Sequence, residues 1–139
     1  NCRFGDPETQ VILPLLKSDL LDIMIATTNG NLDKVKVEFE NKSAACIIMA
    51  SEGYPLEYKK GFAINIPKDI IERVYFAGVK KENEELLTNG GRVLGITNIA
   101  DTLDKAIKLS YKDARQISFE GAYYRKDIGE KALLKKGNN

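Results

Sequence analysis

Polar residues that could bind a cation, a phosphate and an amine lie together at the start of the chain. Asn1, Arg3, Asp6 and Glu8 fall within residues 1–10, which read as a loop that leads into a helix. An asparagine oxygen suits a hard cation such as Mg²⁺. In an extended segment Arg3 points to the same side as Asn1, where its planar fork could hold a phosphate oxygen. Asp6 and Glu8 could receive a substrate ammonium group. The alternative is a solvated loop whose Asp6 and Glu8 cap the next helix, and the residue types alone favour that interpretation.

The composition excludes several kinds of catalytic site. The 139 residues include no histidine, so a Ser-His-Asp triad, a Cys-His pair and a His-ligated zinc site are excluded within this chain. Cys2 and Cys46 fit no CxxC pattern, and we expect both to be reduced thiols of a cytoplasmic protein, Cys46 in the core of a strand. A net charge of +1 argues against nucleic acid or a membrane surface as partner. No apolar run approaches the ~20 residues that span a bilayer.

The elements that must position these residues show helix and strand patterns in succession. Apolar residues over 11–26 recur at three- and four-residue spacing, which predicts an amphipathic helix that ends near a left-handed Gly30. An alternating pattern over 35–39 predicts a strand with one buried face, and the apolar run 44–50 predicts a strand covered on both faces. Further expectations are strands over 62–66 and 73–79, an exposed loop over 80–85, a hairpin of 86–88 and 92–97 around 89–91, a helix from 101 or 102 towards 115, and a short basic helix from 127 to about 136.

Four stretches of the chain together resemble one enzyme family. Residues 1–10 are similar to the N-x-R-F-G-D-P-E-T-Q signature that closes the ATP-grasp domain of glycinamide ribonucleotide synthetases. Residues 49–55 (Met-Ala-Ser-Glu-Gly-Tyr-Pro), 88–94 (Thr-Asn-Gly-Gly-Arg-Val-Leu) and 124–129 (Tyr-Arg-Lys-Asp-Ile-Gly) resemble the same family. Each short stretch alone is a weak signal, but four in the right order and spacing are a strong one.

The resemblance implies a reaction and roles for the first residues. In this family the carboxylate of glycine attacks the γ-phosphate of ATP, and the amine of 5-phosphoribosylamine then displaces phosphate from glycyl phosphate. Asn1 matches the asparagine that binds Mg²⁺ (or Mn²⁺) in the E-x-N-x-R pattern of ATP-grasp enzymes. Arg3 matches the arginine beside the transferring phosphoryl group, where a fixed positive charge stabilises the developing anion. Asp6 and Glu8 would face the amine-bearing substrates.

Three later basic residues are expected to contact substrate if the resemblance holds. Arg92 would face the catalytic cleft from the 89–91 turn, although the residues alone favour a purely structural turn. Arg125 and Lys126 match an Arg-Lys-x-x-Gly-like element that reaches the ribose 5-phosphate in related ATP-grasp enzymes. The alternative for this basic pair is a solvated face of the tail.

The resemblance also implies a domain organisation. Residues 1–30 would be the end of the ATP-grasp catalytic domain, and 31–139 the ligase C-terminal domain, an α+β unit with a small antiparallel, barrel-like sheet and packed helices. The glutamate of the E-x-N-x-R pattern and the groups that hold ATP would lie in the remainder of the enzyme, so we expect this chain to be inactive alone. Two alternatives stay open: the C-terminal domain of a sibling ATP-grasp carboxylase, and a non-catalytic ligand-binding or interaction module.

Overall fold

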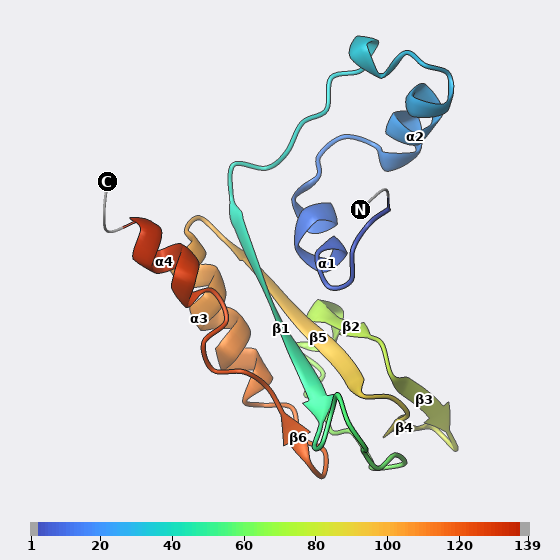
Figure 1. Ribbon diagram of the computed structural model, residues 1–139, viewed down its shortest axis with the longest axis vertical. Helices are drawn as coiled ribbons and strands as arrows, with labels where there is room; N and C mark the ends of the chain where they lie inside the picture. The colour runs from blue at the N-terminus through green and yellow to red at the C-terminus, as the bar shows by residue number, and fades with distance from the viewer. Residues whose placement is uncertain (1–2, 137–139) are drawn as a thin grey trace.

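The computed structural model describes residues 3–136, which fold into two antiparallel sheets with helices packed beside them (Figure 1). This confirms the predicted α+β class. The first sheet has the strand order β2-β5-β1-β6, and the second pairs β3 with β4. The strands are β1 (Ser43–Ser51), β2 (Val74–Phe76), β3 (Val79–Glu82), β4 (Glu85–Thr88), β5 (Arg92–Ala100) and β6 (Ala122–Tyr123). The helices are α1 (Thr9–Ile12), α2 (Leu20–Thr28), α3 (Leu103–Ala114) and α4 (Glu130–Lys136), with 3-10 turns at Leu13–Leu15, Leu32–Lys34 and Ile71–Arg73.

The long central strands β1 and β5 carry the core. They pair in register from Ser43–Ala100 to Met49–Leu94, and alternate residues of each strand point to the face covered by α3. That face is lined by side chains with almost no exposure: Ile47, Met49, Leu94 and Ile96. The burial of each such side chain contributes about 1.5–3 kcal/mol. The other face is half-buried beneath α1, so the prediction of a β1 strand covered on both faces is confirmed in outline.

Two buried polar residues fasten α3 to these strands. The hydroxyl of Ser110 donates to the carbonyl of Ala45 at 2.8 Å and accepts from the backbone N–H of Asn98 at 3.1 Å. Asp113 accepts from Nε of Arg73 at 2.8 Å and from the side-chain amide of Asn98 at 2.9 Å. Because buried polar groups cost free energy unless they are hydrogen-bonded, these contacts fix the helix in one position on the sheet.

The segment 62–66 lies between strand β4 and the chain that precedes β6. It is extended but forms isolated bridges, Ala63 with Leu87 and Asn65 with Ser118, instead of the predicted strand. The backbone N–H of Asn65 donates to the carbonyl of Ser118 at 2.8 Å, and the reverse bond is 3.1 Å long. The second sheet therefore connects through this segment to the chain that leads into β6.

The predicted single helix over 11–26 is wrong, because the chain breaks between α1 and α2. A proline inside a helix removes a backbone hydrogen bond and clashes with the preceding turn, and Pro14 lies in the 3-10 turn that ends α1. Asp19 then starts a new helix, since its carboxylate accepts from the N–H groups of Leu21 and Asp22. The predicted left-handed end is confirmed: Gly30 has φ +66° after α2.

The predicted strand over 35–39 is also wrong. Residues 35–39 include one isolated bridge, between Phe39 and Leu16, and no paired strand within the described part of the chain. Val37 and Phe39 are largely exposed, so the alternating pattern does not mark a buried face here. Alternation predicts which side chains share a face, but a strand forms only where a neighbour accepts its hydrogen bonds.

The predicted hairpin around 89–91 is wrong for a related reason. The hairpin is β3–β4, and its turn is formed by Asn83 and Glu84, which both have positive φ. The mixed-charge run expected as a loop is therefore the tip of this hairpin. Residues 89–91 link the two sheets, and Gly78 divides the predicted 73–79 strand into β2 and β3. The backbones of Gly78 and Gly90 cross so closely that a Cβ on Gly78 would lie 2.5 Å from the Cα of Gly90.

Candidate functional site

Three stretches that are distant in sequence meet at one end of the four-stranded sheet. Ala50, near the end of β1, is paired with Arg92 of β5 on one side and with Tyr123 of β6 on the other. The Ser51 hydroxyl donates to the carbonyl of Gly90 at 3.0 Å, and the Ser51 N–H donates to the carbonyl of Gly91 at 2.8 Å. We call this region, made of residues 49–55, 88–94 and 121–124, the motif end.

Tyr54 packs directly on the glycine-rich link. A Cβ added to Gly91 would lie 2.2 Å from the Tyr54 ring, so only a glycine allows the ring to approach this closely. The ring of Tyr58 meets that of Tyr54 edge-on, with centroids 6.3 Å apart. Residues 49–55 and 88–94, noted separately in the sequence, are therefore one packed unit.

The N-terminal loop is attached to the motif end by an ion pair. Arg92 uses Nη2 to contact the carboxylate of Asp6, and its Nη1 donates to the backbone carbonyl of the same residue at 3.1 Å. The two residues are 86 positions apart in the sequence. Among the described residues the structure thus brings together two of the predicted site residues, Asp6 and Arg92, by direct contact.

The other residues of the loop make fewer contacts. Arg3 is exposed, and its guanidinium donates to the carbonyl of the adjacent Phe4 at 3.0 Å. Glu8 is also exposed and occupies the N-cap position of α1 without a side-chain capping bond. Asp6 pairs with Arg92 and Glu8 forms no capping bond, so neither acid caps α1 through its side chain. Asn1, the predicted metal ligand, lies outside the described residues.

Arg125 and Lys126 lie just beyond β6, next to α3. The guanidinium of Arg125 forms a two-bond pair with Asp127, at 2.9 and 2.7 Å, which raises the pKa of Arg125 and lowers that of Asp127. The Tyr111 hydroxyl donates to the carbonyl of Arg125 at 2.8 Å, and burial raises the pKa of that tyrosine. Lys126 is exposed and lines a shallow hollow beside Tyr124. Within residues 3–136 no hydrogen bond or ion pair joins Arg125 or Lys126 to the Asp6–Arg92 pair.

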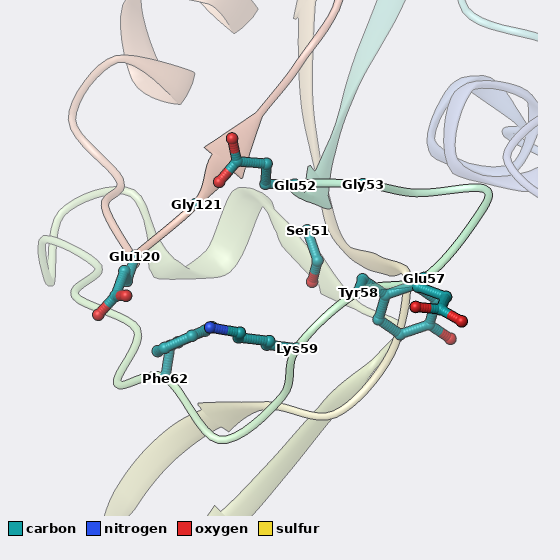
Figure 2. Close-up of a pocket in the computed structure, with 9 residues that line it drawn as sticks. All are labelled: Ser51, Glu52, Gly53, Glu57, Tyr58, Lys59, Phe62, Glu120 and Gly121. Carbon is teal, nitrogen blue, oxygen red and sulfur yellow. The ribbon is translucent and has the colours of Figure 1, made fainter.

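A cavity of about 460 Å³ adjoins the motif end (Figure 2). Figure 2 shows Glu52 and Glu120 on one side of it and Glu57 with Tyr58 on the other. Its lining also includes Ser51, Gly53, Lys59, Phe62 and Gly121. These residues were not predicted as a group, because they come from stretches that are distant in sequence. The one available signal in the sequence was the 49–55 motif, which contains three of the lining residues, Ser51, Glu52 and Gly53.

Within the described residues two kinds of feature are absent. Residues 3–136 contain no group of three or more acidic or cysteine side chains arranged to hold a metal ion. None of the helices in the same range is both long enough and apolar enough to cross a membrane. Cys46 is half-buried in β1 and forms no disulfide within this range, and burial raises the pKa of its thiol.

Comparisons with known proteins agree on one family. The sequence profile of the phosphoribosylglycinamide synthetase C domain matches residues 44–131. The chain is 48% identical over 134 residues to a phosphoribosylamine–glycine ligase of Fusobacterium nucleatum, covering 93% of this chain and 32% of the relative. It is 52% identical over 129 residues to a ligase of the same name from Caldanaerobacter subterraneus, covering 92% of this chain and 31% of the relative.

A solved structure supports the same assignment. The crystal structure of phosphoribosylamine–glycine ligase from Thermotoga maritima superposes with a TM-score of 0.73 at 34% identity, covering 91% of this chain and 31% of that one. The chain thus spans about a third of the length of these relatives. The family predicted from the four stretches is confirmed. Two of the stretches, 49–55 and 88–94, meet at the motif end, and the 1–10 stretch is tied to it through Asp6. The 124–129 stretch begins at its edge and continues beside α3. This chain belongs to the phosphoribosylglycinamide synthetase family and corresponds to the C-terminal part of its members.

Proposed function

We propose that this chain is the C-terminal part of an ATP-dependent ligase that joins glycine to 5-phosphoribosylamine in purine biosynthesis in the cytoplasm. In this proposal the preceding part of the enzyme holds ATP, and this chain completes the wall of the active site and contacts substrate. The observation that carries the proposal is that three family stretches, 1–10, 49–55 and 88–94, are joined at the motif end by the Asp6–Arg92 pair and the Ser51–Gly90 hydrogen bond.

The first three residues would serve phosphoryl transfer. Asn1 would bind Mg²⁺ or Mn²⁺ together with oxygens of the preceding part and of ATP, and the ion would neutralise charge on the phosphates. Arg3 would stabilise the anion that develops as the phosphoryl group moves. Its exposed guanidinium contacts one neighbouring carbonyl, which leaves other N–H donors to meet a phosphate.

The remaining site residues would serve the amine-bearing substrates. Asp6 contacts Arg92 at the start of β5, and Glu8 follows Asp6 by two residues; these three residues would contact substrate, and Arg125 and Lys126 would bind the ribose 5-phosphate. A phosphate, like a carboxylate, can pair with arginine through two parallel bonds, so it would compete with Asp127 for Arg125. The exposed ammonium of Lys126 would add a second positive charge at that point.

The domain boundary near residue 30 is also part of the proposal. In α2 the side chains of Leu21, Met24 and Ile25 are largely exposed, and Ala26 is the buried residue of the helix. A helix with this much exposed apolar surface is typical of an element that packs against another domain. We propose that residues 1–30 complete the preceding ATP-grasp domain and that 31–139 form the ligase C-terminal domain.

The direct test is turnover by the full-length enzyme and its Arg3→Ala variant. ADP release is measured with ATP, Mg²⁺, 5-phosphoribosylamine, and with or without glycine. We expect glycine-dependent turnover in the parent and a loss on the order of a hundredfold or more in the variant. Lys17→Ala, which removes another exposed basic side chain of the same segment, is the control and should keep parental turnover.

Two outcomes would contradict the proposal. Turnover that depends on bicarbonate but not on glycine would favour a sibling ATP-grasp carboxylase. ATP-dependent product formation by the isolated 139-residue chain would show that the preceding part is not needed to hold ATP.

A further inference from the structure

We infer that Arg92 is a positioning residue that holds the loop of Asp6 on the sheet and acts on the ligase reaction through that loop. This inference rests on the proposed function, and it changes how Arg92 contributes to it. The resemblance implies that Arg92 faces substrate. The structure instead directs its guanidinium to a single residue of the same chain, 86 positions earlier.

The contact with the backbone of Asp6 distinguishes positioning from simple charge pairing. One nitrogen of Arg92 contacts the Asp6 carboxylate, and another donates to the Asp6 carbonyl at 3.1 Å. A carboxylate can turn away about its side-chain bonds, but a carbonyl moves only when the main chain moves. The planar guanidinium holds both acceptors in one orientation, so it specifies where the backbone of the loop lies.

Arg92 is the fixed partner and the loop is the one that is held. Arg92 begins β5 and is paired with Ala50, and its carbonyl accepts from the N–H of Gly78 at 2.9 Å. The next two residues, Val93 and Leu94, are fully buried, which anchors the backbone of Arg92 in the core. The loop has local support at its helical end, where the N–H of Thr9 donates to the carbonyl of Gly5 at 3.0 Å.

The position of Asp6 in the loop gives this contact its consequence. Arg3 lies three residues before Asp6 and Glu8 two residues after it, so a shift of Asp6 displaces both. Reacting groups that are misplaced by about 1 Å can lose on the order of a hundredfold in rate. With the Asp6 carboxylate already paired, Glu8 is the exposed acid of this loop that forms no ion pair within residues 3–136.

The test is a double-mutant cycle in the full-length enzyme, with Arg92→Ala, Asp6→Ala and the double variant. If Arg92 acts through Asp6, each single variant should lower kcat on the order of fivefold or more, as expected for a partly exposed charge-assisted contact. The double variant should then be no worse than the poorer single variant, because both remove the same contact. Fold-losses that multiply in the double variant would show that Arg92 and Asp6 act independently, and would overturn the inference.

Hydrogen exchange of the same proteins supplies a readout that does not depend on turnover. We expect faster amide exchange in residues 5–9 of Arg92→Ala, with exchange in α3 unchanged. Asp6→Ala removes the side-chain acceptor of Arg92 and leaves β5 intact, so it should raise the same exchange and keeps the test valid if Arg92→Ala fails to fold. Lys81→Ala, which breaks the exposed 2.6 Å pair with Glu84 on the β3–β4 hairpin, is the matched control and should change neither readout.

The two proposals fail in different ways. A parent enzyme without glycine-dependent turnover would overturn the proposed function. If the parent is active and the amides of residues 5–9 exchange equally fast in the parent and in Arg92→Ala, the positioning role alone would be overturned.

Discussion

Replacing Gly78 by alanine should destabilise the chain severely, because two backbone segments cross at this residue. A Cβ on Gly78 would lie 2.5 Å from the Cα of Gly90, 2.6 Å from the carbonyl oxygen of Arg92 and 2.8 Å from the nitrogen of Gly90. All three atoms belong to the backbone, so no side chain can rotate away to make room. The crossing must open, and with it the hydrogen bond from the N–H of Gly78 to Arg92.

The expected cost is about 3 kcal/mol, at the upper end of the 1–3 kcal/mol usual for overpacking. That is a large part of the ~5–15 kcal/mol stability of a typical domain. The assay is urea unfolding of the chain followed by far-ultraviolet circular dichroism. A lower urea concentration at the unfolding midpoint, with an unchanged dependence of the unfolding free energy on urea, would indicate lost stability.

Gly30→Ala is the matched control, because it tests backbone strain without crowding. Gly30 has φ +66°, but a Cβ there would have no atom within 4 Å. We expect a cost of about 1 kcal/mol from the left-handed conformation alone. If Gly78→Ala costs no more than Gly30→Ala, the argument that the crossing is too tight for a side chain is wrong.

Two further predictions concern helix α3 and strand β1, away from the motif end. Ser110→Ala should lower the free energy of unfolding by about 2 kcal/mol in the same urea assay. The reason is that the carbonyl of Ala45 and the N–H of Asn98 both lose a buried partner. A loss of stability no larger than that caused by Ser118→Ala, at an exposed serine, would contradict this. Burial raises the pKa of Cys46, so the folded chain binds the thiol proton more tightly than the unfolded chain does. The resulting stability is complete below the unfolded pKa and is lost as the pH rises through the folded pKa. In a Cys2→Ser background, a Cys46→Ser variant should therefore lose less stability than its parent between pH 8 and 10, and equal losses would refute the argument.

The sequence predicted the parts of the fold that depend on local chemistry. The continuous apolar run was sufficient to predict strand β1, and the helical spacing of apolar residues was sufficient to predict α3. Gly30 marked the left-handed end of α2. Each of these features depends on residues that are neighbours in the chain. Pro14 and Asp19 indicated the break between α1 and α2, but the apolar periodicity over 11–26 led to the prediction of a single helix.

Strand pairing could not be obtained in the same way. The sequence around Gly90 is typical of a hairpin turn, yet β4 pairs with β3, and β5 pairs with β1 and β2. The choice between partners depends on which faces are buried against the core, and that is decided across the whole sheet. The residues 35–39 show the converse, since an alternating pattern without a partner strand stays extended and exposed.

By itself, the sequence determined the family and the residue types that the site contains, because family signatures and side-chain chemistry are local properties of the chain. The tertiary structure alone decided which of these residues meet. It joined Asp6 to Arg92 and placed the stretch of Tyr54 on the glycine-rich link. It separated Arg125 and Lys126 from that pair and placed them beside α3. The physical reason is that contacts between distant residues depend on strand register and packing, which no short stretch of sequence specifies.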